Sequence, residues 1–206
     1  MNLYFYDEKK LQGEASRQMA IACMKAYIEE WGEPEKRACE RPELAKPNHG
    51  AGRASKWEIA EGPHGKPFFP NINLEYSVSH SGLLWVCAIG EKPLGIDIQE
   101  VRETDVEKTA ERFFTPEEAH YVKLWGSDGF FDLWVRKEAF VKYLGTGFSG
   151  SGGFDDFSLL DEKGDLKDGT SLGDEEGVFM IPDMGFDIKC AVCAKEKEEI
   201  NLRPIG

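Results

Sequence analysis

The order of apolar and polar positions predicts a chain in which helices and strands are mixed. Strands alternate apolar and polar residues or form short apolar runs, whereas helices repeat apolar residues every three to four positions. On these patterns we expect strands at residues 1–7, 75–79, 83–89, 94–99, 157–160, 177–181 and 186–193. We expect helices at residues 15–31, 107–114, 115–124 and 130–144. The turn at Gly90–Pro93 predicts a hairpin between strands 83–89 and 94–99.

The same pattern divides the chain into two halves, 1–100 and 101–206, which each open with helix and close on strands. Segment 35–56 is polar and rich in Lys and Arg, which makes it a candidate anion site, although a solvated loop is the simpler explanation. Segment 145–153 is rich in glycine and predicts a flexible loop. Segment 161–176 is acidic and predicts an exposed connection.

The expected helix at 130–144 carries a carboxylate among apolar side chains. By helical spacing Glu138 shares a stripe with Phe131, Trp134 and Val135. A carboxylate in such a place is costly to bury unless a metal or a cation compensates its charge. The simpler interpretation is that Glu138 forms an ion pair with Lys142, one turn further on, at a solvated edge of the helix. The residues of this helix alone leave both interpretations open.

Two oxygen-bearing side chains stand next to each other on the strand at 94–99. Because side chains alternate along a strand, Leu94, Ile96 and Ile98 face the core while Asp97 and Gln99 face the other way. Neighbouring oxygen ligands suit a hard cation such as Mg²⁺. An edge strand with a solvated polar face would show the same pattern, so both interpretations stand at this point.

A helix start and a helix break are visible before the carboxylate. Thr115 is a suitable N-cap, Pro116 fits the first helical position, and Glu118 completes a capping box. The glycines of segment 126–129 predict that the helix is interrupted there.

Composition narrows the classes of function. The net charge is −13, from 38 acidic and 25 basic residues, which argues against a nucleic-acid-binding protein. The sequence contains no apolar run long enough to span a membrane, and residues 1–10 lack the apolar core of a signal peptide, so we expect a cytoplasmic protein. Scattered cysteines indicate reduced thiols. Cys190 and Cys193 form a C-x-x-C pair, for which a strand is a better explanation than a metal site.

Five short motifs, in order along residues 65–144, resemble those of the 4′-phosphopantetheinyl transferase superfamily in its larger, monomeric, surfactin-synthetase-activating type. They are Gly65-Lys66-Pro67, Ser77-Val78-Ser79-His80-Ser81, Gly95-Ile96-Asp97-Ile98, Arg112-Phe113-Phe114-Thr115 and Trp134-x-x-Lys137-Glu138-Ala139-Phe140-x-Lys142. Each motif alone is weak evidence, and their common order and spacing make the resemblance strong. The first 60 residues match the family poorly.

The resemblance implies that the protein transfers the phosphopantetheine arm of coenzyme A to a serine of an apo acyl or peptidyl carrier protein and releases adenosine 3′,5′-bisphosphate. It also implies an α+β fold of two pseudo-symmetric halves with the active site in the cleft between them. Asp97, Gln99 and Glu138 would hold Mg²⁺, or Mn²⁺ in its place, and Lys142 would contact the same phosphates. Many relatives carry a glutamate where this chain has Gln99, which adds no charge and cannot act as a base. Glu138 is therefore the expected base.

By the same resemblance His80 would contact the 3′-phosphate of coenzyme A, with Lys66 and Ser79 nearby. A turn histidine hydrogen-bonded to Ser79 or Ser81 is the alternative for His80. The carrier is expected to dock near Arg112, Phe113, Phe114 and Gly126. Two rival functions are open at this stage: a carrier-binding paralogue without turnover, and a Mg²⁺-dependent nuclease, which the acidic charge disfavours.

Overall fold

The computed structural model describes residues 1–34, 55–147 and 153–205. The helices of this part of the chain are α1 (Gly13–Trp31), α2 (Val106–Phe113) and α3 (Pro116–Leu144), with a 3-10 turn η1 (Phe154–Asp156). The strands are β1 (Asn2–Tyr6), β2 (Ala60–Glu61), β3 (Pro67–Phe68), β4 (Glu75–Ser81), β5 (Leu84–Gly90), β6 (Leu94–Glu100), β7 (Gly169–Leu172), β8 (Glu175–Met180), β9 (Ile188–Ala194) and β10 (Asn201–Pro204). The mixture of elements is that of an α+β fold, as predicted.

The longer strands form two four-stranded sheets. The first sheet has the order β10-β1-β5-β4 and the second sheet the order β6-β9-β8-β7, while β2 and β3 pair separately. Strand β10 runs parallel to β1, with Asn2 opposite Asn201, and the other pairs are antiparallel. The last described strand of the chain is therefore part of the same sheet as the first.

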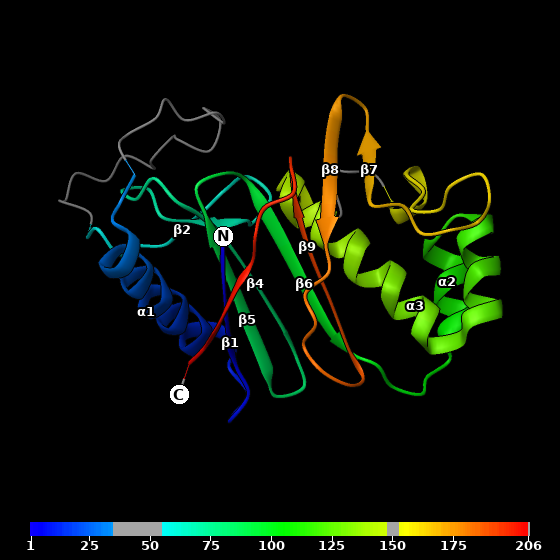
Figure 1. Ribbon diagram of the computed structural model, residues 1–206, viewed down its shortest axis with the longest axis horizontal. Helices are drawn as coiled ribbons and strands as arrows, with labels where there is room; N and C mark the ends of the chain where they lie inside the picture. Colours follow the sequence, from blue (N-terminus) through cyan, green and yellow to red (C-terminus); the bar gives the residue numbers. More distant parts are fainter. Residues whose placement is uncertain (35–54, 148–152, 206) are drawn as a thin grey trace.

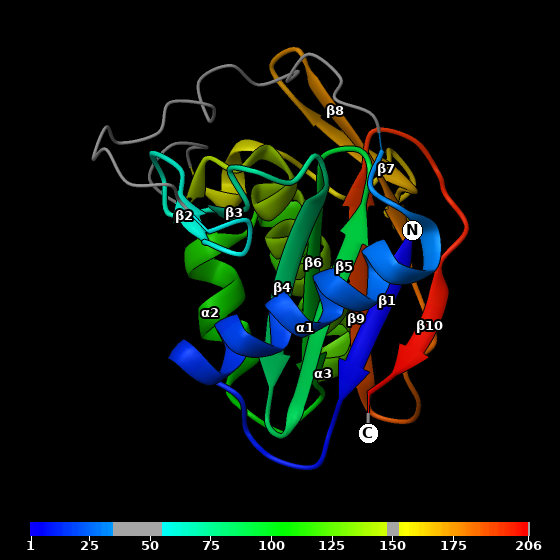
Figure 2. The ribbon, with the colours of Figure 1, turned by 90° about the vertical axis from the view of Figure 1, so that its left-hand side faces the viewer.

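The two sheets lie between helices in four layers (Figure 1). Tyr4 and Trp85 of the first sheet pack on α1, which crosses that sheet in Figure 2. The opposite face of the first sheet, with Leu3 and Val86, packs on Ile96 of the second sheet and its neighbours. The far face of the second sheet packs on α3 through a third cluster. Apolar side chains thus fill the space between all four layers.

Strand β6 is placed by a partner that is distant in the sequence. It pairs with β9 along its length, with Asp97 opposite Ala191, and it lies in a different sheet from β5. The prediction of a β5–β6 hairpin across Gly90–Pro93 was therefore wrong. The connection moves the chain from the first sheet to the second, because the apolar faces of both strands are needed to fill the core between the sheets. Leu94, Ile96 and Ile98 face that core, as predicted.

Several smaller elements also differ from the predictions. Residues 157–160 form no strand beyond a single bridge between Leu160 and Leu166. Strand β7 lies within the acidic segment that was expected to be only an exposed connection, and β2, β3 and β10 were not predicted. These are short strands whose pairing depends on partners elsewhere, so local periodicity does not reveal them.

Helix α3 begins and bends as the sequence predicts. The Thr115 hydroxyl accepts the Glu118 N–H and the Glu118 carboxylate accepts the Thr115 N–H, which completes the capping box. At Gly126 the backbone is not helical, with φ of 61° and ψ of −144°, so α3 consists of two helical stretches joined at a kink, as the predicted interruption requires. Near its C-terminal end α3 approaches β6 closely at Gly95, where a Cβ atom would lie 2.1 Å from the Ala139 carbonyl oxygen. A glycine is therefore required there.

The remaining sequence predictions have different outcomes. The basic segment 35–56 and the centre of the glycine-rich loop lie mostly outside the described residues. Cys190 faces the core between the sheets and Cys193 faces α3, so the two thiols point to opposite sides of β9 and cannot share a metal. No described helix has the length and apolarity to cross a membrane. The division at residue 100 into two halves stays a prediction.

Candidate active site

The predicted carboxylates meet where β4, β6 and the last turns of α3 come together. Asp97, on β6, is 2% exposed and accepts a hydrogen bond on Oδ1 from Lys142 Nζ of α3 at 2.8 Å. Gln99 Nε2 donates to the other oxygen of Asp97 at 3.2 Å. The polar face of β6 is therefore covered by α3, and the alternative of a solvated edge does not hold for Asp97.

Glu138, one turn before Lys142 on α3, lies in the same place. The pKa of Glu138 is raised from 4.5 to about 7, mainly by burial and also by the negative charge of Asp97, and the positive charge of Lys142 opposes both effects. The effect of Asp97 means that the two carboxylates are close enough to repel each other. Lys142 forms its ion pair with Asp97, so the interpretation of a simple Glu138–Lys142 pair at a solvated edge is wrong.

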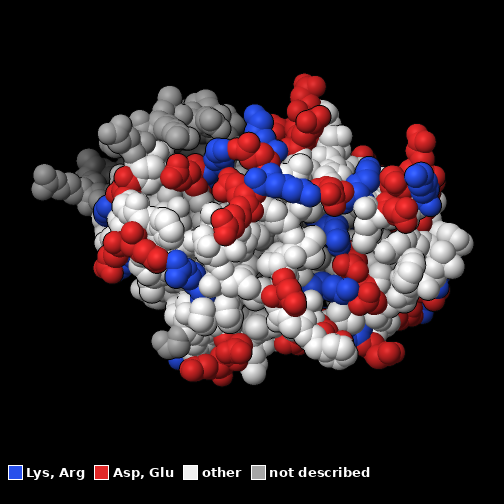
Figure 3. All heavy atoms as spheres, in the orientation of Figure 1, with Lys and Arg blue, Asp and Glu red and all other residues white. Residues whose placement is uncertain are grey.

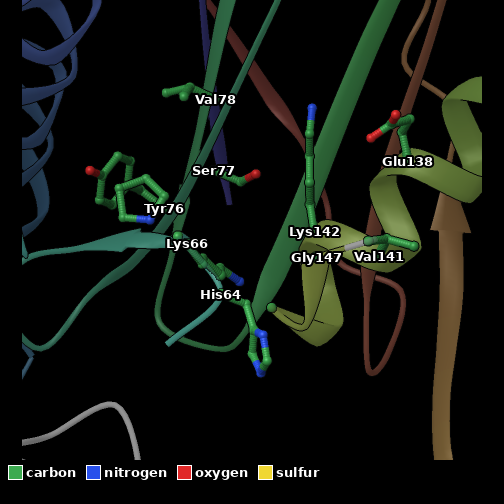
Figure 4. A pocket seen from close by; sticks show the side chains of 12 residues that line it. His64, Lys66, Tyr76, Ser77, Val78, Glu138, Val141, Lys142 and Gly147 are labelled. Atoms are coloured by element: carbon green, nitrogen blue, oxygen red, sulfur yellow. The ribbon is translucent and has the colours of Figure 1, made fainter. Parts of the chain in front are cut away.

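Two lysines cover the backbone beside Asp97. Lys142 Nζ also donates to the Ile96 carbonyl at 3.0 Å, and Lys66 Nζ donates to the Leu94 carbonyl at 2.9 Å. Both line a pocket of about 240 Å³, together with Ser77, Glu138 and His64. Figure 4 shows these side chains around the pocket, with Lys66 on the side opposite α3 and His64 close to Gly147, just after α3. A pocket with ammonium groups on both walls suits an anionic ligand.

The side chains around Asp97 fit a hard divalent cation. Their possible ligands are two carboxylates and one amide, and oxygen donors of this kind are what Mg²⁺ and Mn²⁺ prefer. The repulsion that raises the pKa of Glu138 is what a cation between the carboxylates would relieve. Within the described residues no group of three or more His, Cys, Asp or Glu side chains is placed so that it could hold a metal ion.

Ser79 and His80, neighbours on β4, differ in their surroundings. Ser79 is buried, and its hydroxyl donates to Asp97 Oδ1 at 2.6 Å. His80 is exposed and does not line the pocket that holds Lys66. The hydroxyls of Ser79 and Ser81 are directed to Asp97 and Gln99, so neither provides the turn contact considered for His80. The role of His80 toward coenzyme A stays a prediction.

Lys137, the neighbour of Glu138 in the sequence, is completely buried. Its Nζ atom lies 2.8 Å from Glu118 Oε2 and donates to the Phe154 and Phe157 carbonyls at 2.6 and 2.8 Å. Glu118 Oε1 accepts the Leu159 N–H at 2.8 Å. Burial lowers the pKa of Lys137, and Glu118 opposes this effect. This network, which the sequence did not reveal, attaches α3 to the turn after it and so fixes the helix that carries Glu138.

The surface expected to dock a carrier is only partly available. Phe114 is 5% exposed and packs in the core, while Arg112 is exposed and lies over the ring of Phe113. Leu124 and Trp125, just before the Gly126 kink, are 69% and 62% exposed. On the face of the molecule in Figure 3, basic and acidic side chains are interspersed, so that face carries no continuous basic surface for a nucleic acid.

Comparisons with known proteins bear on this site. Residues 93–179 match the model of a family described as the 4′-phosphopantetheinyl transferase superfamily. A 4′-phosphopantetheinyl transferase of Bacillus subtilis is 35% identical over 139 residues, which are 64% of this chain and 60% of that protein. The transferase Sfp of Bacillus subtilis strain 168 is 34% identical over 141 residues, 64% of this chain and 60% of its own. The transferase gsp of Aneurinibacillus migulanus is 38% identical over 88 residues, 41% and 36% of the two chains. The chain thus spans about 60% of the length of the first of these relatives.

Proposed function

We propose, from the match of residues 93–179 to the model of the 4′-phosphopantetheinyl transferase superfamily, that this protein transfers the phosphopantetheine arm of coenzyme A to a carrier protein. The acceptor is a serine of an apo acyl or peptidyl carrier, and adenosine 3′,5′-bisphosphate is released. The observation that supports the proposal most is that Glu138 and Lys142 of α3 line one pocket and that Lys142 forms an ion pair with Asp97 of β6. Asp97 comes from one motif of the resemblance, and Glu138 and Lys142 come from another.

The reaction requires one bond to form and one to break. The serine oxygen of the carrier attacks the phosphorus atom that bears the pantetheine arm. The bond from that phosphorus to the bridging pyrophosphate oxygen breaks, and the bridging oxygen leaves with adenosine 3′,5′-bisphosphate. The serine proton passes to the Glu138 carboxylate, directly or through a water molecule. Gln99 cannot take this role because an amide does not accept the proton at neutral pH.

Charge in the pocket would be balanced by lysines and a cation. Lys142 and Lys66, which line the pocket, would contact the phosphates of coenzyme A, with His80 and Ser79 proposed toward the 3′-phosphate. Asp97, Gln99 and Glu138 would hold Mg²⁺ or Mn²⁺. When bound, such a cation would neutralise negative charge on the pyrophosphate. Because Gln99 adds no charge, we expect weak Mg²⁺ binding in the absence of coenzyme A.

The location, oligomeric state and partners of the protein are also proposals. We propose a cytoplasmic monomer whose halves, 1–100 and 101–206, form the site between them, and whose partners are coenzyme A and a carrier and neither a nucleic acid nor a membrane. Arg112, Phe113 and the exposed Leu124 and Trp125 are the proposed contacts for the carrier. The pathway of that carrier is left to experiment.

The test is intact-mass analysis of several apo carriers incubated with this protein, coenzyme A and Mg²⁺. The expected result is a mass gain equal to one phosphopantetheine arm on at least one carrier, which excess chelator abolishes. Binding of a carrier without a mass gain would instead identify a paralogue without turnover. Full activity in excess chelator would remove the cation from the proposal.

A further inference from the structure

Strand β6 lies at an edge of the second sheet, and its outer edge is covered by side chains. The N–H groups of Ile96, Ile98 and Glu100 donate to serine hydroxyl oxygens at 3.2, 3.4 and 3.0 Å. The carbonyls of Leu94 and Ile96 accept from Lys66 and Lys142, as described above. An edge strand normally leaves such groups to water or to another strand. Here these three N–H groups and two carbonyls on the outer edge of β6 are satisfied without either.

The serines that accept these N–H groups come from β4, the edge strand of the first sheet. Ser77 accepts from Ile96, Ser79 from Ile98 and Ser81 from Glu100. Alternate residues of a strand project from the same face, so serines at every second position form a regular row. We call Ser77, Ser79 and Ser81 the serine ladder. The ladder fixes the position of β6 relative to β4 and so joins the two sheets.

Ser79 and Ser81 of the serine ladder each make a second hydrogen bond, to a side chain of the candidate active site. Ser79 Oγ donates to Asp97 Oδ1 at 2.6 Å, and Ser81 Oγ donates to Gln99 Oε1 at 3.4 Å. A serine hydroxyl has one proton to donate, and both serines use it on a predicted cation ligand while they accept from β6. Ser77 lies beside Gly95, where β6 has no side chain to receive such a bond.

Gln99 connects Asp97 to Ser81 through two hydrogen bonds of its amide. Its Nε2 donates to Asp97 Oδ2 and its Oε1 accepts from Ser81, so the amide has one orientation. A carboxylate at this position would repel Asp97. The amide therefore stabilises Asp97 in the orientation in which its other oxygen meets Ser79 and Lys142.

We propose that Ser79 and Ser81 are positioning residues, which orient Asp97 and Gln99 for a divalent cation through the serine ladder. The inference rests on the proposed function for the identity of the cation, and it concerns residues that do not touch the reacting atoms. Groups that hydrogen-bond to metal ligands typically change metal affinity by about 10-fold to 100-fold when removed. Removal of the Ser79 hydroxyl, which makes the short bond to Asp97, should lower cation affinity more than removal of the Ser81 hydroxyl.

The test uses Mn²⁺ as the probe and coenzyme A at saturation, with Mn²⁺ binding followed by electron paramagnetic resonance. Ser79→Ala should weaken Mn²⁺ binding about 10-fold, the lower end of the range for such groups. Ser77→Ala is the matched control, because it also removes the acceptor of one β6 N–H but no bond to a predicted ligand. It should change Mn²⁺ affinity less than about 2-fold while lowering thermal stability as much as Ser79→Ala does. Ser79→Thr keeps the hydroxyl and should restore the affinity.

Each other outcome contradicts the proposal. Equal losses of Mn²⁺ affinity in Ser77→Ala and Ser79→Ala would mean that the serine ladder only holds β6 in place and does not orient the predicted ligands. No loss in Ser79→Ala, or no Mn²⁺ binding by the wild type, would also overturn it. Because the assay contains no carrier protein, a failure of phosphopantetheine transfer leaves its result unaffected. The two proposals therefore fail separately.

Discussion

Glu138 should lower the stability of the cation-free protein at neutral pH, and Glu138→Gln should restore it. The pKa of Glu138 is raised from 4.5 to about 7, so the folded state holds the proton more tightly than the unfolded state. The stability that protonation contributes is present below pH 4.5 and is lost as pH rises through about 7. The difference between the two pKa values corresponds to about 3 kcal/mol.

Urea unfolding in cation-free buffer measures this effect. At pH 8 Glu138→Gln should raise the free energy of unfolding by about 3 kcal/mol relative to wild type, and at pH 5 by less than about 1 kcal/mol. Glu175→Gln, at an exposed position of β8, is the control for the loss of one charge and should stay within about 0.5 kcal/mol at both pH values. A difference between Glu138→Gln and wild type that is the same at pH 5 and pH 8 would refute the reasoning.

The same substitution should remove activity. Glu138→Gln deletes the proposed base and one carboxylate ligand, so turnover should fall at least about 100-fold. We expect a variant to gain stability and lose turnover when the replaced residue serves function and destabilises the fold. Wild-type turnover in Glu138→Gln would remove this residue from the mechanism.

Three further predictions concern neighbouring residues. Lys137→Met should destabilise the protein by about 3–5 kcal/mol in urea unfolding, because it leaves Glu118 buried without its partner; a loss below about 1 kcal/mol would show that water reaches this pair. Gly95→Ala should lower the free energy of unfolding by about 1–3 kcal/mol and lower turnover, since the new Cβ forces α3 away from β6. Unchanged thermal stability and turnover would disprove the close approach of α3 to β6. In steady-state assays Asp97→Ala should reduce turnover more than Gln99→Ala, because water can replace a neutral ligand; equal losses would mean that the amide has a role beyond its charge.

The local features of this chain could be predicted from its sequence. The capping box at Thr115 and the kink at Gly126 depend on residues within one turn of each other, so their signals are complete in a short segment. The alternation that separates Asp97 from Ile96 and Ile98 is likewise a property of one strand. The motifs that carry Asp97, Glu138 and Lys142 indicated a common site, and these residues do lie together.

Features that join distant segments were missed. The pairing of β6 with β9 and of β1 with β10 depends on which edges meet in three dimensions, and no local pattern specifies a partner about 90 to 200 residues away. The ion pair of Lys137 with Glu118 was missed, because Glu118 was assigned to the capping box alone. The alternating serines of β4 were a visible signal, but their meaning required the N–H groups of β6 beside them.

The central claim is that the site of Asp97, Glu138 and Lys142 transfers phosphopantetheine from coenzyme A to a carrier serine. The most direct measurement follows the mass of an apo carrier and the amount of adenosine 3′,5′-bisphosphate in one reaction with coenzyme A and Mg²⁺. The account predicts that holo carrier and bisphosphate appear in equal amounts, and that neither appears when the acceptor serine of the carrier is replaced by alanine. Bisphosphate release that is unaffected by that replacement, or no mass gain on any carrier tested, would contradict the claim.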